Sequence, residues 1–271
     1  MTSAAVANPL LGVKHLSKAF SGVHAVDDFG FTVERGAIVG LIGPNGSGKS
    51  TTIDCITGFT AADLGTVMLD GVSLTGARAE QVAQAGMVRT FQNVRVYDRL
   101  SLIENVLIAR QAYDNVSWWQ VLAASPACRT AEARARDRGR ELIHLVGLAA
   151  MMEFPAAFLS YGQKKLLALA MTLMSDPKIV ILDEPLAGVN PTVIRRVATL
   201  IRSLNDSGQT FIIVEHNVQF IMDHCSKVVV MEQGRKLAEG PPALIREDER
   251  VLHAYLGKAD AVAMELAFHG R

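Results

Sequence analysis

The chain has 271 residues, and its 27 Lys and Arg balance 27 Asp and Glu, so the formal net charge is zero. Apolar residues make up 49% and charged residues 20%, the ordinary composition of a globular protein that can bury a sizeable core. The neutral balance argues against a dedicated nucleic-acid or anionic-lipid binder, because neither is held well without a net positive field. Three cysteines without a CxxC pattern indicate reduced thiols rather than disulfides or a zinc site: Cys55, Cys128 and Cys225.

Apolar runs in the chain are short. None approaches the ~18–20 residues that a membrane-spanning helix requires. The N-terminus also lacks a basic stretch followed by an apolar block, so no secretory signal is expected. We therefore expect a cytosolic chain that reaches a membrane only through other proteins.

The first elements alternate between short apolar segments and turns. Leu11–Leu16 and Phe29–Val33 predict antiparallel strands, and the compact apolar run Ala37–Ile42 predicts a buried strand. A helix is expected to begin at Lys49 and to stop at Gly58, because glycine suits a helix C-terminus.

The middle of the chain, roughly residues 101–157, has a different character. Leu102, Val106 and Ala109 have helical spacing, and residues 129–147 are rich in Ala, Arg and Glu, so we expect an inserted, mostly helical subdomain. Residues 129–141 hold five arginines and three acids. This segment is either a basic contact patch or, as is commoner, a solvated helix face.

Strands and helices alternate again in the last third. Ile179–Leu182, Phe211–Val214 and Val228–Met231 predict buried strands. A helix with one apolar face is expected to open at Pro191 and to stop near Gly208. This alternation predicts a mostly parallel sheet covered by helices on both faces.

A glycine-rich segment lies between the strand at residues 37–42 and the helix from Lys49. Gly43-Pro44-Asn45-Gly46-Ser47-Gly48-Lys49-Ser50 matches the GxxxxGK[ST] pattern of a P-loop. Glycines let backbone N–H groups turn toward phosphate oxygens, and the helix N-terminus adds positive potential. Lys49 is expected to reach the β- and γ-phosphates, and the Ser50 hydroxyl to bind Mg²⁺. The segment does not match the GxGxxG fingerprint of a dinucleotide-binding site, because Thr51 occupies the position of the third glycine.

Two acids end the strand at residues 179–182. Asp183 is placed to hold Mg²⁺ through its waters, and Glu184 is the candidate base that polarises an attacking water. On their own, acids after a strand are weak evidence for a functional site. The presence of a P-loop earlier in the chain strengthens this interpretation.

The segment Leu159-Ser160-Tyr161-Gly162-Gln163 precedes another apolar helical pattern. Ser160 and Gln163 have the spacing of a capping box. A capped helix N-terminus is also an anion site suited to a γ-phosphate, so both readings stay open.

The order of these motifs resembles the nucleotide-binding subunit of an ATP-binding-cassette transporter. That family's P-loop, glutamine loop, signature, Walker B motif and histidine switch correspond to residues 43–51, Gln92, 159–163, Asp183-Glu184 and His216. The resemblance covers roughly residues 11–257. It implies an α/β fold: a P-loop NTPase core with a mostly parallel sheet, an N-terminal antiparallel β subdomain and an inserted helical signature subdomain. It also implies one domain at 8–257, a helical subdomain at about 95–175 and a C-terminal tail at 258–271.

The resemblance implies ATP and Mg²⁺ as ligands and a role for each matching residue. The phosphate-binding residues would be Gly43, Asn45, Gly46, Gly48, Lys49, Ser50 and Thr51. The Mg²⁺ ligands would be Ser50, Gln92 and Asp183, and the catalytic residues Glu184, His216 and Gln92. Phe20 would stack on adenine, its alternative being a buried core phenylalanine. The residues facing ATP held by a partner cassette would be Ser160, Gly162 and Gln163, with Asn190 in the D-loop.

Several segments resemble the branched-chain amino acid uptake branch of the family: 89–95, 100–106, 187–191, 239–242 and 254–257. The resemblance implies a second cassette, identical or different, and two transmembrane permease subunits. An extracytoplasmic substrate-binding protein would act indirectly, and no nucleic acid would take part. The chain would then lie at the cytoplasmic face of the inner or plasma membrane.

Three positions depart from the family pattern. Tyr161 replaces a glycine of the signature, Asn190 stands where Asp is frequent, and Asn217 follows His216 in place of Asp. Asn190 also suits a helix N-cap before Pro191. None removes a phosphate ligand or the base, so we expect hydrolysis to survive.

Other functions stay open at this point. They are a cassette for another substrate (an amide, urea, another amino acid or an exported lipid), a soluble cassette ATPase acting on nucleic acid or ribosomes, and a P-loop kinase. The kinase class lacks a signature such as Leu159–Gln163, and His216 would have no evident role in it.

Overall fold

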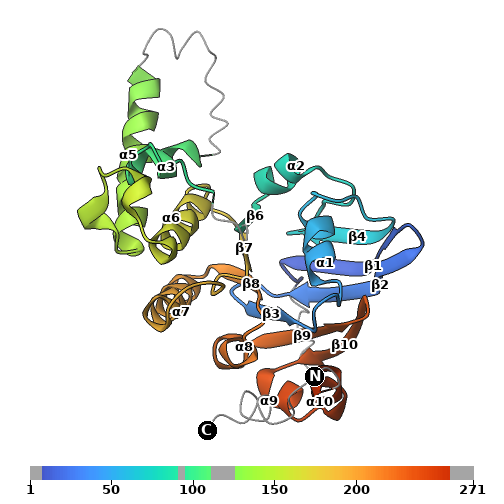
Figure 1. The fold of residues 1–271 in the computed structure, drawn as a ribbon. Helices are drawn as coiled ribbons and strands as arrows, with labels where there is room; N and C mark the ends of the chain where they lie inside the picture. Colours follow the sequence, from blue (N-terminus) through green and yellow to red (C-terminus); the bar gives the residue numbers. More distant parts are fainter. Residues whose placement is uncertain (1–7, 91–94, 111–125, 257–271) are drawn as a thin grey trace, which may run out of the picture. The chain divides into compact units, whose positions relative to one another are not determined.

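The structure, a computed structural model, describes residues 8–90, 95–110 and 126–256. The chain forms two compact units. The first unit contains Met1–Arg89, Lys178–Pro185 and Arg202–Arg271. The second contains Thr90–Pro177 and Leu186–Ile201 (Figure 1). The domain limits expected from the sequence remain a prediction.

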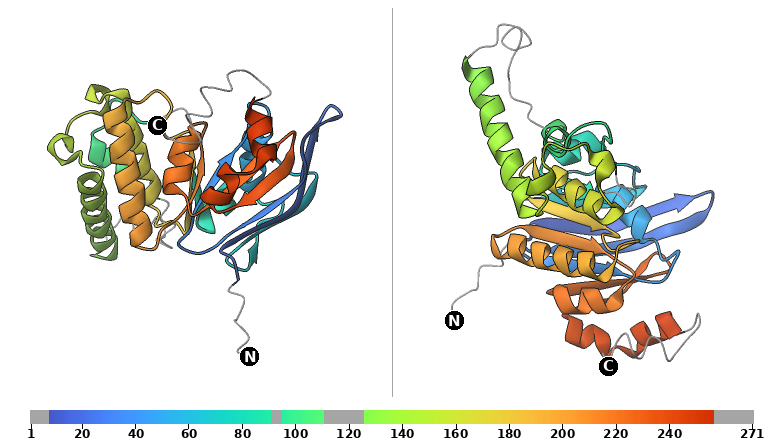
Figure 2. Two further views of the ribbon diagram at one scale, coloured as in Figure 1. Left: turned by 90° about the horizontal axis from the view of Figure 1, so that it is seen from below. Right: turned by 60° about the vertical axis from the view of Figure 1, so that its left-hand side comes forward.

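An antiparallel sheet opens the first unit, in the order β2-β1-β4-β5. Its strands are β1 (Leu11–Phe20), β2 (Val23–Val33), β4 (Leu64–Leu69) and β5 (Val72–Ser73). The predicted antiparallel strands are confirmed, but β1 and β2 run on to 10 and 11 residues and form a long curved hairpin (Figure 2). The two residues at its tip, Ser21 and Gly22, both have positive φ, as a tight hairpin turn requires.

A six-stranded sheet holds the other strands in the order β10-β9-β3-β8-β7-β6. These are β3 (Ile38–Ile42), β6 (Met87–Thr90), β7 (Ile179–Asp183), β8 (Thr210–Val214), β9 (Lys227–Glu232) and β10 (Arg235–Gly240). Strand β3 pairs in parallel with β8 and β9, β7 pairs in parallel with β8, and β10 is antiparallel to β9. The predicted mostly parallel sheet is confirmed.

Helices cover both faces of β3. On one face Val39 and Leu41 share a core with Ile53 of α1 (Lys49–Ile56). On the other face a Cβ at Gly40 would lie 2.4 Å from Ile221 Cγ2 of α8 (Val218–His224), so only glycine admits that helix. The remaining helices of this unit are α2 (Ala79–Gln84), α9 (Pro242–Arg246) and α10 (Glu249–Leu256).

The second unit is helical, as predicted for the middle of the chain. Its helices are α3 (Leu102–Ile108), α5 (Pro126–Leu145), α6 (Tyr161–Leu173), the first turns of α7 (Pro191–Asp206) and two short 3₁₀ helices, Ala149–Met151 and Ala156–Phe158. Helices α3, α5 and α6 pack on one another. At one crossing a Cβ on Gly139 would approach Ile103 Cδ1 to 2.9 Å. Within the described ranges, no helix combines the length and apolar character needed to cross a membrane.

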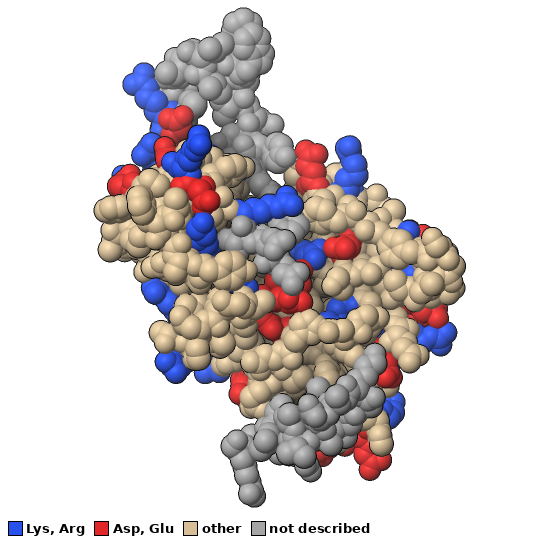
Figure 3. All heavy atoms as spheres, in the orientation of Figure 1, with Lys and Arg blue, Asp and Glu red and all other residues tan. Residues whose placement is uncertain are grey.

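Arginines along α5 have acidic partners. Arg138 pairs with Asp176 at 2.9 Å and with Glu141 at 3.3 Å, and Arg140 pairs with Asp137 at 3.1 Å. Figure 3 shows acidic and basic side chains interspersed at this end of the second unit. These pairs favour the solvated helix face over the basic contact patch.

Candidate functional site

The loop between β3 and α1 is held in a conformation that requires glycine. A Cβ on Gly43 would lie 2.1 Å from Met231 O, and one on Gly48, whose φ is +102°, would lie 2.2 Å from Ala25 O. Gly46 differs, because its φ is +77° and no atom lies within 4 Å of an added Cβ. Packing therefore fixes both ends of the loop, while its middle faces open space where a ligand can approach the backbone.

Lys49, the first residue of α1, folds back over this loop. Its buried ammonium donates hydrogen bonds to Gly43 O at 2.7 Å and to Pro44 O at 3.0 Å. Burial lowers the pKa of Lys49, while the charges of Glu184 and Asp183 act to raise it. The lysine is thus inside the loop and within the electrostatic reach of both acids.

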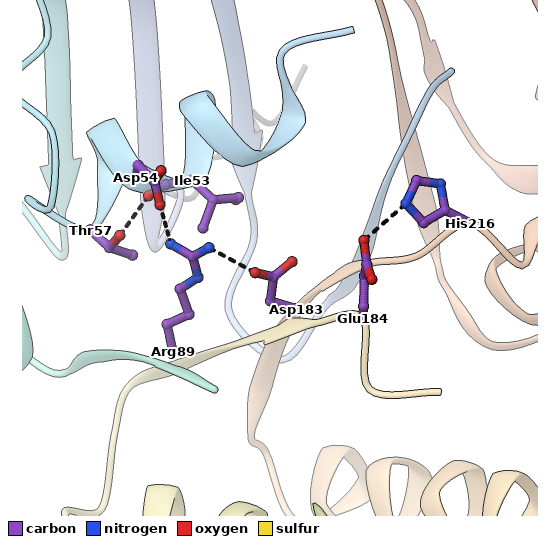
Figure 4. Close-up of polar contacts among 7 residues, drawn as sticks. All are labelled: Ile53, Asp54, Thr57, Arg89, Asp183, Glu184 and His216. Carbon is purple, nitrogen blue, oxygen red and sulfur yellow. Dashed lines mark hydrogen bonds and ion pairs between the residues drawn. The ribbon is translucent and has the colours of Figure 1, made fainter. Parts of the chain in front are cut away.

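Asp183 and Glu184 lie at the carboxyl end of β7. Strand β8 pairs in parallel with β7, so the segment that follows β8 reaches the same edge of the sheet as Asp183 and Glu184. The Glu184 backbone adopts a left-handed conformation with a φ of +48°, and its N–H donates to Val214 O at 2.9 Å. Its Oε1 lies 2.9 Å from His216 Nε2 (Figure 4). The structure therefore brings together two of the three predicted catalytic residues.

Arg89, near the end of β6, bridges two acids that no sequence motif connects. Its guanidinium donates to Asp183 Oδ2 at 2.7 Å and also to Asp54 Oδ1 on α1 (Figure 4). Burial opposes the charge on Arg89, but the bonds to Asp183 and Asp54 outweigh it and raise its pKa. In the sequence Arg89 was visible only as part of a segment that resembles the family.

Tyr255 on α10 connects the C-terminal helices with the P-loop. Burial raises the pKa of its phenol, and a hydrogen bond with the Gly43 backbone acts in the opposite direction. A bond that lowers a phenol pKa stabilises the phenolate, so the Gly43 N–H is the donor. The sequence of residues 249–256 contains no motif that predicts this contact.

Phe20 ends β1 and is 49% exposed, so the buried-core alternative is wrong. Lys18 Nζ lies 5.3 Å from the centre of its ring and 2.8 Å from Asp63 Oδ1. The aromatic ring is therefore presented at the surface of the first unit.

In the second unit, Ser160 and Gln163 form the predicted capping box of α6. Ser160 Oγ accepts from Gln163 N at 3.3 Å, and Gln163 Oε1 accepts from Ser160 N at 2.8 Å. Gly162 lies against α7, where an added Cβ would meet Val193 Cγ2 at 2.8 Å. Asn190 caps α7 as predicted, because its Oδ1 accepts from Val193 N at 3.0 Å.

Two positions that depart from the family pattern have structural roles. The Tyr161 ring packs against Gly188, where an added Cβ would lie 3.1 Å from Tyr161 Cε1. Asn217 caps α8, with its Oδ1 accepting from Phe220 N at 3.0 Å.

The predicted site residues divide between the units. The P-loop, Phe20, Asp183, Glu184 and His216 belong to the first unit, and Ser160, Gly162, Gln163 and Asn190 to the second. Asn45 in the loop before α1 and Ser50 in the first turn of α1 are exposed, and Thr51 is half-buried. Gln92 lies outside the described residues, as do the tail 258–271 and the side chain of Cys128.

Comparison with known proteins agrees with these motifs. Residues 26–187 match the family described as ABC transporter, and residues 235–261 match the description branched-chain amino acid ATP-binding cassette transporter. The high-affinity branched-chain amino acid transport ATP-binding protein BraF of Pseudomonas aeruginosa is 36% identical over 255 residues, which cover 94% of this chain and 100% of BraF. The lipopolysaccharide export system ATP-binding protein LptB of Escherichia coli is 33% identical over 248 residues, covering 92% and 97%.

The fold has close structural counterparts. A crystal structure of an ATP-binding cassette of an ABC transporter in its ADP conformation superimposes with a TM-score of 0.80 at 29% identity, covering 92% of this chain and 99% of that one. The family predicted from the order of the motifs is confirmed. The chain belongs to the ABC transporter family, and within it to the nucleotide-binding cassettes.

Proposed function

We propose that this chain hydrolyses ATP and thereby powers a membrane importer for branched-chain amino acids. The observation that carries the proposal is the Glu184–His216 pair at 2.9 Å, in the same unit as a P-loop whose Lys49 is within electrostatic reach of Glu184. A paired carboxylate near a phosphate-binding loop is suited to activate water for phosphoryl transfer.

The P-loop would bind the phosphates of ATP. Its glycines leave the loop's middle open, the N-terminus of α1 adds positive potential, and the Lys49 ammonium would exchange its carbonyl partners for phosphate oxygens. Asn45, Ser50 and Thr51 would add polar contacts. Phe20, exposed at the end of β1, would stack on the adenine ring.

The residues at this site suit a magnesium ion. Ser50 offers an exposed hydroxyl in the first turn of α1, and Asp183 offers a carboxylate at the end of β7. Oxygen groups of this kind, few in number, hold Mg²⁺ together with waters and substrate phosphates. The ion would supply charge neutralisation on the phosphates. Gln92 is expected to join these residues.

Glu184 would act as the base for hydrolysis. Water would attack the γ-phosphorus, its proton would pass to the Glu184 carboxylate, and the bond between the γ-phosphorus and the bridging oxygen would break to release ADP. His216 would orient that carboxylate through the observed contact and would reach the γ-phosphate with its imidazole.

The second unit would act on ATP held by a partner cassette. Ser160, Gly162 and Gln163 surround the N-terminus of α6, whose backbone N–H groups favour an anion. Contacts to a γ-phosphate that exist only in a closed pair would bias the pair toward closure, and hydrolysis would release it. Two permease subunits would convert this motion into transport and hold the chain at the cytoplasmic face of the membrane.

The substrate assignment is supported by the similarity to BraF and by the match of the C-terminal segment. Similarity to LptB supports lipopolysaccharide export as a second candidate. A strain whose chromosomal copy carries Glu184→Gln separates the two through uptake of radiolabelled leucine, isoleucine and valine and through the lipopolysaccharide content of its outer membrane.

Loss of the three uptake activities with unchanged lipopolysaccharide is the expected result. Normal uptake together with depleted surface lipopolysaccharide would replace import by export. Affinity purification from detergent-solubilised membranes adds a check on the partners, because an importer should yield two hydrophobic permeases. Recovery of ribosomes or DNA-processing proteins alone would overturn the transport function.

A further inference from the structure

Arg89 joins two elements of the first unit that carry expected metal ligands. Its guanidinium binds Asp183 at the end of β7 and Asp54 on α1 (Figure 4). We propose that Arg89 is a positioning residue that sets the distance between α1 and Asp183 and so prepares the site for a divalent cation. This inference rests on the proposed function, because it concerns the same nucleotide site.

The spacing on α1 gives the bridge its significance. Ser50 and Asp54 are four residues apart in this helix, so their side chains lie on the same face, one turn from each other. A restraint on Asp54 is therefore a restraint on the face that presents the Ser50 hydroxyl. Through Arg89, that face is tied to Asp183 on a strand far away in the sequence.

Burial strengthens the bridge at its Asp183 end, whereas the Asp54 side chain is 36% exposed. The side chains of Arg89 and Asp183 are only 10% and 11% exposed, so solvent screens their ion pair weakly. The planar guanidinium offers several N–H donors in fixed directions and can hold two carboxylates at once. A lysine ammonium at the same position is a single point charge and would not fix both acids with the same geometry.

A plainer role for Arg89 would be to compensate the charge of the buried Asp183. The two roles predict opposite effects of Arg89→Met on the affinity for a divalent cation. If Arg89 only supplies charge, Arg89→Met removes a repulsive neighbour and the cation binds more tightly. If Arg89 positions Asp183, the same change lets the ligands drift apart and the cation binds more weakly. Substitution of a residue that supports a metal ligand typically weakens metal binding by about 10–100-fold.

The test uses the purified full chain with ADP and with Mn²⁺ as the probe. Electron paramagnetic resonance of free Mn²⁺ measures the dissociation constant of Mn²⁺ from the protein–ADP complex. Arg89→Met should raise that constant about tenfold or more. Asp54→Ala, which leaves the Arg89–Asp183 bond but removes the acceptor on α1, should also raise it. Arg89→Lys should fall between Arg89→Met and the wild type.

Two controls separate this effect from other changes. ADP affinity measured in EDTA should stay within twofold of the wild type in every variant, because the P-loop is intact. Arg35→Met removes the same side chain from an ion pair with Asp70 elsewhere in the unit and should leave the Mn²⁺ affinity unchanged.

Three outcomes are decisive. Equal or tighter Mn²⁺ binding by Arg89→Met, or unchanged binding by Asp54→Ala, overturns the positioning role. If Arg89→Met does not fold, Arg89→Lys decides, because it keeps the charge, and Mn²⁺ affinity equal to the wild type in that variant overturns the positioning role. A wild-type chain that fails to bind ADP at all contradicts the proposed function instead and is recognised before any variant is measured.

Discussion

His216 Nε2 lies 2.9 Å from Glu184 Oε1, which links the segments that follow two neighbouring parallel strands. The Glu184 backbone is itself fixed, since its N–H donates to Val214 O. The carboxylate is therefore held from both its main chain and its side chain, which suits a base that must keep one orientation toward a water.

Glu184→Gln should abolish turnover and preserve binding. The amide cannot accept the proton of the attacking water, so we expect kcat for ATP hydrolysis to fall at least about 100-fold. The affinity for ATP should change little, because the P-loop is untouched. Phosphate release and titration with a fluorescent ATP analogue measure the two quantities. Full turnover in this variant would remove Glu184 as the base.

The same variant tests the pairing of cassettes. With its natural partner cassette and ATP, Glu184→Gln should elute as a dimer from gel filtration, because the trapped ATP keeps the pair closed. His216→Ala is the companion variant. It removes one charge-assisted hydrogen bond to the base and should lower kcat about tenfold or more, with ATP affinity nearly unchanged. Persistent monomers of Glu184→Gln with bound ATP would contradict the shared-site arrangement.

Phe20→Ala should weaken nucleotide binding without destabilising the fold. Stacking of a base on an aromatic ring contributes about 1–3 kcal/mol, so the dissociation constant for ATP should rise about tenfold. The ring is half exposed, and its loss should leave the melting temperature close to that of the wild type. Phe59→Ala is the matched control, because Phe59 is exposed to a similar extent. Equal effects of both substitutions on ATP affinity would refute adenine stacking on Phe20.

Local features of the site were predictable from the sequence. The capping box of Ser160 and Gln163 and the N-cap at Asn190 depend only on residues within a few positions of one another. The P-loop likewise combines adjacent residues with the strand before it and the helix after it. Short-range geometry of this kind is encoded in residue type and spacing.

Contacts between distant segments were not predictable in the same way. Arg89 lies 35 residues from Asp54 and 94 residues from Asp183, and only the strand order brings the three together. The contact of Tyr255 with Gly43 similarly depends on how α10 packs. The hairpin extension of β1 and β2 is not predicted from the sequence, because its apolar and polar residues do not alternate strictly and backbone pairing defines it instead.

Two cysteines should be nearly inert toward alkylation in the folded chain. Burial raises the pKa of the Cys55 thiol to about 11 and that of Cys225 to about 12. A thiol reacts as the thiolate, so at pH 8 the reactive fraction is reduced about 100-fold or more relative to an ordinary cysteine. Labelling with iodoacetamide should rise with pH and become complete only after denaturation. Peptide mass spectrometry assigns the label to each residue, and rapid labelling of either thiol in the native protein would contradict the packing.

Asn105→Leu should destabilise the helical unit. The fully buried amide accepts from Tyr97 N at 2.7 Å and donates to the carbonyls of Tyr97, Leu100 and Ser101. Leucine removes the acceptor of Tyr97 N and one donor to each carbonyl, which keep their backbone donors, at a cost of about 3 kcal/mol. A melting temperature lower by roughly 6–12 °C is expected from scanning fluorimetry.

The control for that variant is Glu104→Gln. Glutamine can still accept from Ser101 N in the capping box, so stability should stay near the wild-type value. Nucleotide binding by the Asn105→Leu protein at low temperature should persist, since the P-loop belongs to the other unit. Equal melting temperatures for Asn105→Leu and wild type would show that the loop at residues 97–101 does not depend on this amide.

Tyr255→Phe should weaken ATP binding through the P-loop backbone. The Gly43 N–H donates to the phenol, while Gly43 O accepts from Lys49, so the same residue is held on both sides. Phenylalanine keeps the packing of α10 but leaves that N–H unpaired, at a cost of about 1 kcal/mol. The dissociation constant for ATP should rise about fivefold, whereas kcat at saturating ATP should stay near the wild-type value because Glu184 and His216 are unaffected. Tyr97→Phe, which removes an exposed hydroxyl from the other unit, is the control. An unchanged ATP affinity in Tyr255→Phe, or a fall in kcat alone, would show that α10 does not support the phosphate loop.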